Sequence, residues 1–135
     1  MTLKELSQLY YLGREIEHDR KRLEELKTKS CAVAGTNLSG MPRSGQENGS
    51  SIERYIAEIV DLEAIISAKI TQCLHERNRL ERYIADIPDS FTRQIFTLRF
   101  IKGFTWVQVA CHVGGGNTAD CVRKVCARYV EKSVS

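Results

Sequence analysis

The stretch Thr105–Tyr129, TWVQVACHVGGGNTADCVRKVCARY, decides the fold, because it encodes two short helices separated by three glycines. Apolar residues recur in its first part at i, i+3, i+4 and i+7, which is typical of one face of a short helix: Trp106, Val109, Ala110 and Val113. Gly114–Gly116 should end that helix, because glycine accepts positive φ at no steric cost. The pattern therefore predicts a helix, a turn and a second helix.

The second helix is predicted to begin at Asn117, as an N-cap with Asp120 as its capping-box partner. Helical periodicity directs one set of side chains inward: Thr118, Val122, Val125 and Tyr129. It turns a second set outward: Asp120, Arg123, Lys124 and Ala127. Small Ala110 lies where the two helices must approach closely. Such a pair predicts a helix-turn-helix, the motif that lays its second helix in a DNA major groove.

The segment Phe91–Ile101 is predicted to be a helix that supports this pair. The order RQIFTLRFIKGFTWVQVACHV, from Arg93 to Val113, resembles region 4 of sigma-70-like transcription factors. The residues in matching places are Ile95, Leu98-Arg99, Gly103, Trp106, Val109-Ala110 and Val113-Gly114. The turn from Gly115 to Thr118 departs from the family by being longer. The resemblance implies a promoter-reading domain of three helices, and the longer turn implies a different angle for the last one.

Positive charge is concentrated in the same part of the chain. Residues 91–135 hold seven Lys or Arg against two Asp or Glu, whereas residues 1–90 hold thirteen against fifteen. A basic excess confined to one segment is typical of nucleic-acid binding, although a solvated basic face is the alternative. Together with the helix-turn-helix it indicates double-stranded DNA as the partner.

The amino-terminal part is predicted to form two long helices, at about residues 2–29 and 51–86, because apolar residues follow heptad spacing there. A Gly- and Ser-rich loop over residues 30–50 should join them, either as a plain linker or as a docking segment through Met41–Arg43. Neither helix can bury its apolar stripe alone. An antiparallel hairpin within one chain is favoured, and a homodimer through the same arm is the alternative. We therefore expect an all-α chain with a hairpin arm over residues 1–87 and a helix-turn-helix domain over residues 88–135.

The whole chain is also similar to a group of small prophage-encoded proteins with a helical hairpin and a helix-turn-helix. Three segments carry this resemblance: SGMPRSG (Ser39–Gly45), IERYIAEIVDLEAII (Ile52–Ile66) and NTADCVRKVCARYV (Asn117–Val130). The resemblance implies a phage or prophage gene regulator.

Several classes of function are not expected. No apolar run reaches the ~20 residues that cross a bilayer, and the first residues are too acidic for a secretory signal, which predicts a cytoplasmic protein. The five cysteines lack CxxC spacing and are predicted to be structural thiols, so neither a metal nor a cofactor is expected. No nucleophile and base can be paired, so we expect no enzymatic activity, no catalytic residue and no small-molecule substrate.

The predicted DNA contacts are Lys102, Thr118, Ala119, Arg123, Lys124, Ala127 and Arg128. Arg123 is expected to contact guanine, whereas Lys124, Arg128 and Lys102 are expected to contact phosphates. Trp106 is expected in the core. The predicted function is a sequence-specific transcription regulator whose arm serves for dimerisation or for contact with RNA polymerase. The alternative is a DNA-packaging factor of the small-terminase type, in which the arm builds a ring.

Overall fold

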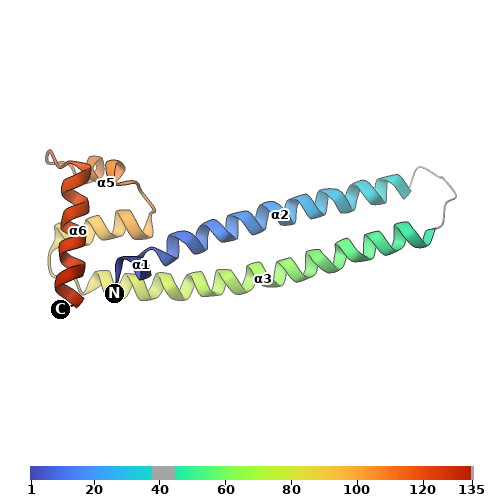
Figure 1. The fold of residues 1–135 in the computed structure, drawn as a ribbon, viewed down its shortest axis with the longest axis horizontal. Coiled ribbons are helices and arrows are strands. Elements are labelled where there is room, and N and C mark those ends of the chain that lie inside the picture. Colours follow the sequence, from blue (N-terminus) through green and yellow to red (C-terminus); the bar gives the residue numbers. More distant parts are fainter. Residues whose placement is uncertain (38–44, 135) are drawn as a thin grey trace. The chain divides into compact units, whose positions relative to one another are not determined.

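The computed structural model describes residues 1–37 and 45–134, and every regular element in these ranges is helical (Figure 1). The all-α class expected from the sequence is thereby confirmed. The elements in chain order are α1 (Leu3–Leu6), α2 (Gln8–Asn37), α3 (Gly45–Ala85), α4 (Ser90–Phe96), the π-helical segment η1 (Thr97–Ile101), α5 (Trp106–Val113) and α6 (Ala119–Val134).

The long helices extend further than the sequence pattern predicts. The first was expected to end near residue 29 and the second to begin at residue 51, but α2 continues to Asn37 and α3 begins at Gly45. Helical residues such as Ala32 and Ala34 explain part of the extension, since alanine has the highest helix propensity. Of the predicted loop, residues 38–44 lie outside the described residues, and so does the Met41–Arg43 segment.

The chain divides into two compact units, Met1–Gly13 with Gln72–Ser135 as unit 1 and Arg14–Thr71 as unit 2. This division differs from the predicted boundary at residues 87 and 88. The ends of α2 and α3 explain the difference, because Leu9 of α2 and Ile84 of α3 are buried in the same core as the carboxy-terminal helices.

In unit 2 the two long helices pack antiparallel. Lys69 of α3 pairs with Asp19 of α2 at 2.6 Å, and Glu63 of α3 pairs with Lys27 of α2 at 3.8 Å. A later residue of α2 therefore pairs with an earlier residue of α3, which is the pattern of antiparallel helices. Asp19 interrupts the apolar heptad, and its carboxylate is neutralised here by Lys69, whose pKa is raised by that hydrogen bond.

The apolar seam of unit 2 is narrower than the heptad pattern suggests. Its buried side chains are Ile16 and Leu26 of α2 and Leu62 and Ile66 of α3. Ile56 fits the heptad spacing but is 51% exposed, whereas Leu62, which lies beside that spacing, is buried. The reason is helical phase, since residues six apart lie about 120° from alignment on a helix of 3.6 residues per turn.

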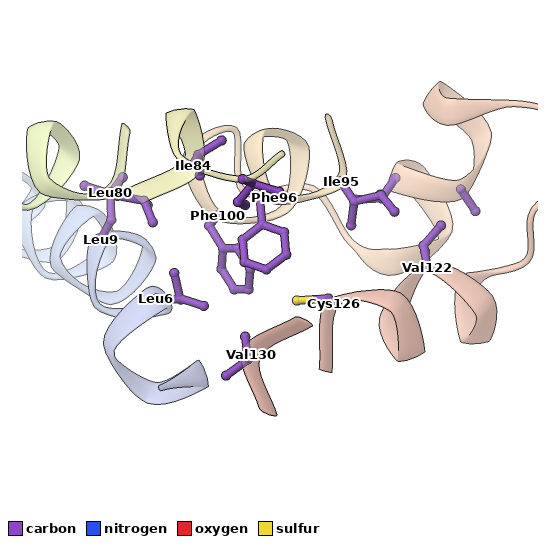
Figure 2. Close-up of a cluster of buried hydrophobic side chains, with 13 residues drawn as sticks. Leu6, Leu9, Leu80, Ile84, Ile95, Phe96, Phe100, Val122, Cys126 and Val130 are labelled. Atoms are coloured by element: carbon purple, nitrogen blue, oxygen red, sulfur yellow. The ribbon is translucent and has the colours of Figure 1, made fainter. Parts of the chain in front are cut away.

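Unit 1 is organised around the side chains of Phe96 and Phe100, which lie between the amino-terminal helices and α6 (Figure 2). Their rings contact each other with centroids 5.4 Å apart, and Tyr129 of α6 meets Phe96 edge-on at 5.5 Å. The other buried residues come from the six α-helices and from the segment after α3: Leu6, Leu9, Leu80, Ile84, Ile87, Ile95, Val109, Ala110, Val122, Cys126 and Val130. This core therefore determines which face of α6 remains open to solvent.

The predicted helix over Phe91–Ile101 is not α-helical throughout. It begins at Ser90 after Asp89, whose carboxylate accepts the Thr92 N–H at 3.2 Å as an N-cap and the Thr92 hydroxyl at 2.7 Å. The hydroxyl bond first, and the backbone bond after it, lower the pKa of Asp89. From Thr97 the backbone widens into η1, where Lys102 N–H donates to Thr97 C=O at 3.1 Å. An i→i+5 bond of this kind inserts one extra residue per turn and is common near functional sites.

Candidate nucleic-acid interface

Helix α5 begins with a complete capping box. The Thr105 hydroxyl accepts the Gln108 N–H at 3.3 Å, and the Gln108 side chain accepts the Thr105 N–H at 2.9 Å. Val109 and Ala110 are buried, so this helix is held against the core by its predicted face.

Trp106 packs against the core with part of its ring exposed, which is less burial than the sequence predicts. The guanidinium of Arg99 lies over this ring at 4.6 Å, and its Nη1 donates to Phe104 C=O at 2.9 Å. A cation over an indole face is attracted by the ring quadrupole. Arg99 thus connects η1 to the start of α5.

The turn between α5 and α6 depends on the predicted run of glycines. Gly114, Gly115 and Gly116 all have positive φ, at 71°, 67° and 73°. A Cβ at Gly114 or Gly116 would meet no atom within 4 Å, so backbone conformation and not lack of space requires glycine there. The Asn117 side chain closes the turn by donating from Nδ2 to Gly114 C=O at 2.7 Å.

Asn117 is therefore not the N-cap of the second helix, and that prediction is wrong. Helix α6 begins one residue later, and the Thr118 hydroxyl accepts the Cys121 N–H at 3.2 Å. The cap thus lies at Thr118, while the Asn117 amide closes the glycine turn. Thr118 is accordingly exposed and not directed inward, and Asp120 takes no part in a capping box.

Helix α6 has one buried face and one exposed face. Val122, Cys126 and Val130 point into the core of unit 1 (Figure 2). On the other side Arg123, Lys124 and Arg128 are exposed, whereas Ala119 and Ala127 are half-buried. The predicted outward set thus lies largely where the sequence placed it.

Asp120 joins the two central cations of the exposed face. Its Oδ1 lies 2.6 Å from Nη2 of Arg123, and its Oδ2 lies 3.0 Å from Nζ of Lys124. The Arg123 hydrogen bond, followed by the Lys124 hydrogen bond, holds the pKa of Asp120 below its usual value. Ion pairs at i,i+3 and i,i+4 with the acid first are typical of a helix surface. The sequence pattern singled out Asp120 but did not identify these partners.

Lys102 belongs to a different surface. It lines a groove of about 450 Å³ whose other lining residues are Ile84, Ser90, Arg93, Gln94, Thr97, Leu98 and His112. None of these residues belongs to α6. Arg93 also donates to Ile87 C=O at 2.7 Å, and His112 Nδ1 lies 3.0 Å from Gln108 C=O. Sequence reasoning missed Arg93 and His112. The spacing of Ser90, Arg93 and Thr97 along one helical face is the signal that could have found the groove.

The cysteines of this region differ in exposure. Cys126 is fully buried, and burial raises the pKa of its thiol to about 12. Cys111 and Cys121 are exposed, although the sequence placed them at or beside the apolar stripe. Across residues 1–37 and 45–134, no group of three or more His, Cys, Asp or Glu side chains is arranged to hold a metal ion.

No helix of the described segments combines the length and the apolar character needed to cross a lipid bilayer. Comparison of the chain with models of known protein families, with curated proteins and with solved structures found no match.

Proposed function

We propose that this protein is a sequence-specific DNA-binding regulator of transcription, of phage or prophage type, and that α5, the glycine turn and α6 act as its helix-turn-helix. The observation that carries the proposal is the cationic surface of α6, where Arg123, Lys124 and Arg128 are exposed while Val122 and Cys126 are buried. A helix held by one face and cationic on the other is suited to enter the major groove.

Each exposed side chain has an expected role. Thr118 and Ala119 open α6, where base-edge contacts are usual in this motif. Arg123 is expected to bind the O6 and N7 atoms of a guanine, and Lys124 to bind a phosphate. Arg128 is expected to add a phosphate contact from α6. Lys102 lines a groove without α6 residues, so its phosphate contact requires DNA that also reaches that groove. The half-buried Ala127 has a side chain small enough for close approach to the groove.

The arm formed by α2 and α3 is proposed to bind a second copy of the chain or RNA polymerase. Ile56 and Val60 of unit 2 support this role, because they lie one turn apart on α3 and are 51% and 58% exposed. Large apolar side chains that neighbour each other on a surface mark an interaction site more often than scattered ones do.

Selection of bound duplexes from a random pool tests the proposal. We expect enrichment of one short sequence, which fluorescence anisotropy should then show to bind more tightly than a random duplex at the same salt concentration. An affinity that is equal for the selected and the random duplex would refute sequence-specific recognition. Phosphate contacts strengthen as the salt concentration falls, so absence of binding at about 50 mM salt would refute DNA binding itself.

The second candidate is a DNA-packaging factor that assembles into a ring. The same exposed apolar residues of α3 favour it, because a ring also requires contacts between arms. Light scattering at several protein concentrations separates the two candidates. A monomer or dimer supports the regulator, whereas a ring of eight or more subunits supports the packaging factor.

A further inference from the structure

The carboxylate of Asp120 has an unusual position relative to the proposed DNA contacts. One oxygen holds Arg123 at 2.6 Å, and the other holds Lys124 at 3.0 Å. Both cationic side chains remain about half exposed, at 53% and 54%. The two groups most suited to DNA are therefore bound, before any DNA arrives, by an acid on the same helix.

Asp120 is not needed to begin the helix. The Thr118 hydroxyl already accepts the Cys121 N–H, which is the bond that a capping box would give. An exposed ion pair also contributes little to folding stability, because solvent screens it. Asp120 also lies in the first turn of α6, where the helix dipole favours an acid, but that effect does not require contacts with two cations. A role for these contacts is therefore to be sought in binding.

We propose that Asp120 is a specificity-determining positioning residue, which orients Arg123 and Lys124 on α6 and lowers affinity for DNA of arbitrary sequence. This inference rests on the proposed function. A phosphate that binds Lys124 must compete with Asp120 for the ammonium group, and the carboxylate also repels the phosphate. The binding of random DNA, which depends almost entirely on phosphate contacts, is weakened most.

A specific DNA sequence can offset this loss of affinity. With one Nη held by Asp120, the guanidinium of Arg123 has fewer orientations, which favours a bidentate contact with one guanine. The carboxylate can in addition accept a hydrogen bond from the N4 amino group of a cytosine. Asp120 thus lowers the affinity for random DNA more than the affinity for the specific site. Repulsive groups produce specificity in this way.

The test compares Asp120→Asn with Glu131→Gln. Both variants remove one negative charge from α6, and Glu131 is exposed near the far end of that helix. Dissociation constants are measured by anisotropy for the selected duplex and for a random duplex, over a range of salt concentrations. Melting temperatures of both variants show that each is folded.

For Asp120→Asn we expect affinity for the random duplex to rise about tenfold, with a salt slope steeper by about one unit, because Lys124 gains a phosphate contact. The ratio of selected to random affinity should fall by about fivefold or more, since a lost base contact or a misoriented arginine removes discrimination. Glu131→Gln should change both affinities equally and by no more than about twofold. The charge of Glu131 is distant from Arg123 and Lys124 and is screened by salt.

Two outcomes overturn the inference while leaving the proposed function standing. The first is a selected-to-random ratio in Asp120→Asn that equals the wild-type ratio. The second is equal behaviour of Asp120→Asn and Glu131→Gln. If neither the wild type nor Asp120→Asn binds any duplex, the proposed function and the inference both fail.

Discussion

Arg123 and Lys124 are neighbours on α6, yet they are expected to make different kinds of contact with DNA. The planar guanidinium of arginine presents donors in a fork that matches the edge of guanine, whereas the ammonium group of lysine acts as a point charge. Their pairing with Asp120 does not change this difference, because both remain exposed.

Replacing each with alanine should separate these roles. Arg123→Ala should lower the selected-to-random affinity ratio, at a cost of about 1–3 kcal/mol in the selected complex. Lys124→Ala should weaken both complexes alike and flatten the salt slope by about one unit. Anisotropy over a salt series measures both effects. Equal changes in the ratio for the two variants would contradict this assignment.

The cysteines offer a second prediction at the residue scale, in their rates of alkylation. Cys126 is buried with its pKa raised to about 12, whereas Cys31, Cys111 and Cys121 are exposed. The reactive species is the thiolate. The exposed cysteines should therefore react with iodoacetamide in the native protein, and Cys126 only after unfolding, as mass spectrometry of the peptides can show.

The raised pKa of Cys126 also determines whether folding stability rises or falls with pH. Burial raises the folded-state pKa of Cys126 from the usual thiol value of 9.0 to about 12, so the folded protein keeps this proton at a pH where the unfolded chain loses it. This contribution to stability is complete below pH 9 and decreases as the pH rises toward 12. Denaturant midpoints that rise with pH in this window for wild type relative to Cys126→Ala would contradict it.

At the scale of elements, the glycine turn depends on backbone conformation. Gly114 has a φ of 71° and open space around it, whereas Gly13 lies inside α2 with open space and no positive φ. Gly114→Ala should destabilise the protein by about 1–2 kcal/mol, because a Cβ clashes with its own backbone in the left-handed region.

Gly13→Ala is the matched control. It should stabilise the protein by up to about 1 kcal/mol, since alanine has the higher helix propensity and loses less entropy. Urea denaturation of both variants measures the two changes. Loss of stability in both, or in neither, would mean that the conformation of the turn does not require glycine.

At the scale of the whole molecule, the question is whether the arm brings two copies together. Val60 is 58% exposed, so Val60→Glu should leave the fold intact. If unit 2 forms the dimer interface, this substitution should shift the protein to monomer, because a charge would be buried against an apolar partner. Light scattering measures the mass and circular dichroism verifies the helix content. A wild-type protein that stays monomeric at high concentration would remove the dimer from the proposal.

Much of the local structure could be read from the sequence. The period of apolar residues indicated the two long helices as well as α5 and α6, and Gly114–Gly116 indicated the turn. These features depend on residues within one or two turns of each other, so the chain specifies them locally. The outward placement of Arg123 and Lys124 followed from the same periodicity.

Only the tertiary structure decided the rest. The π-helical segment from Thr97 and the burial of Leu62 in place of Ile56 each result from competition between local preference and contacts with other segments. Periodicity cannot rank such contacts, because several nearby residues satisfy it equally well.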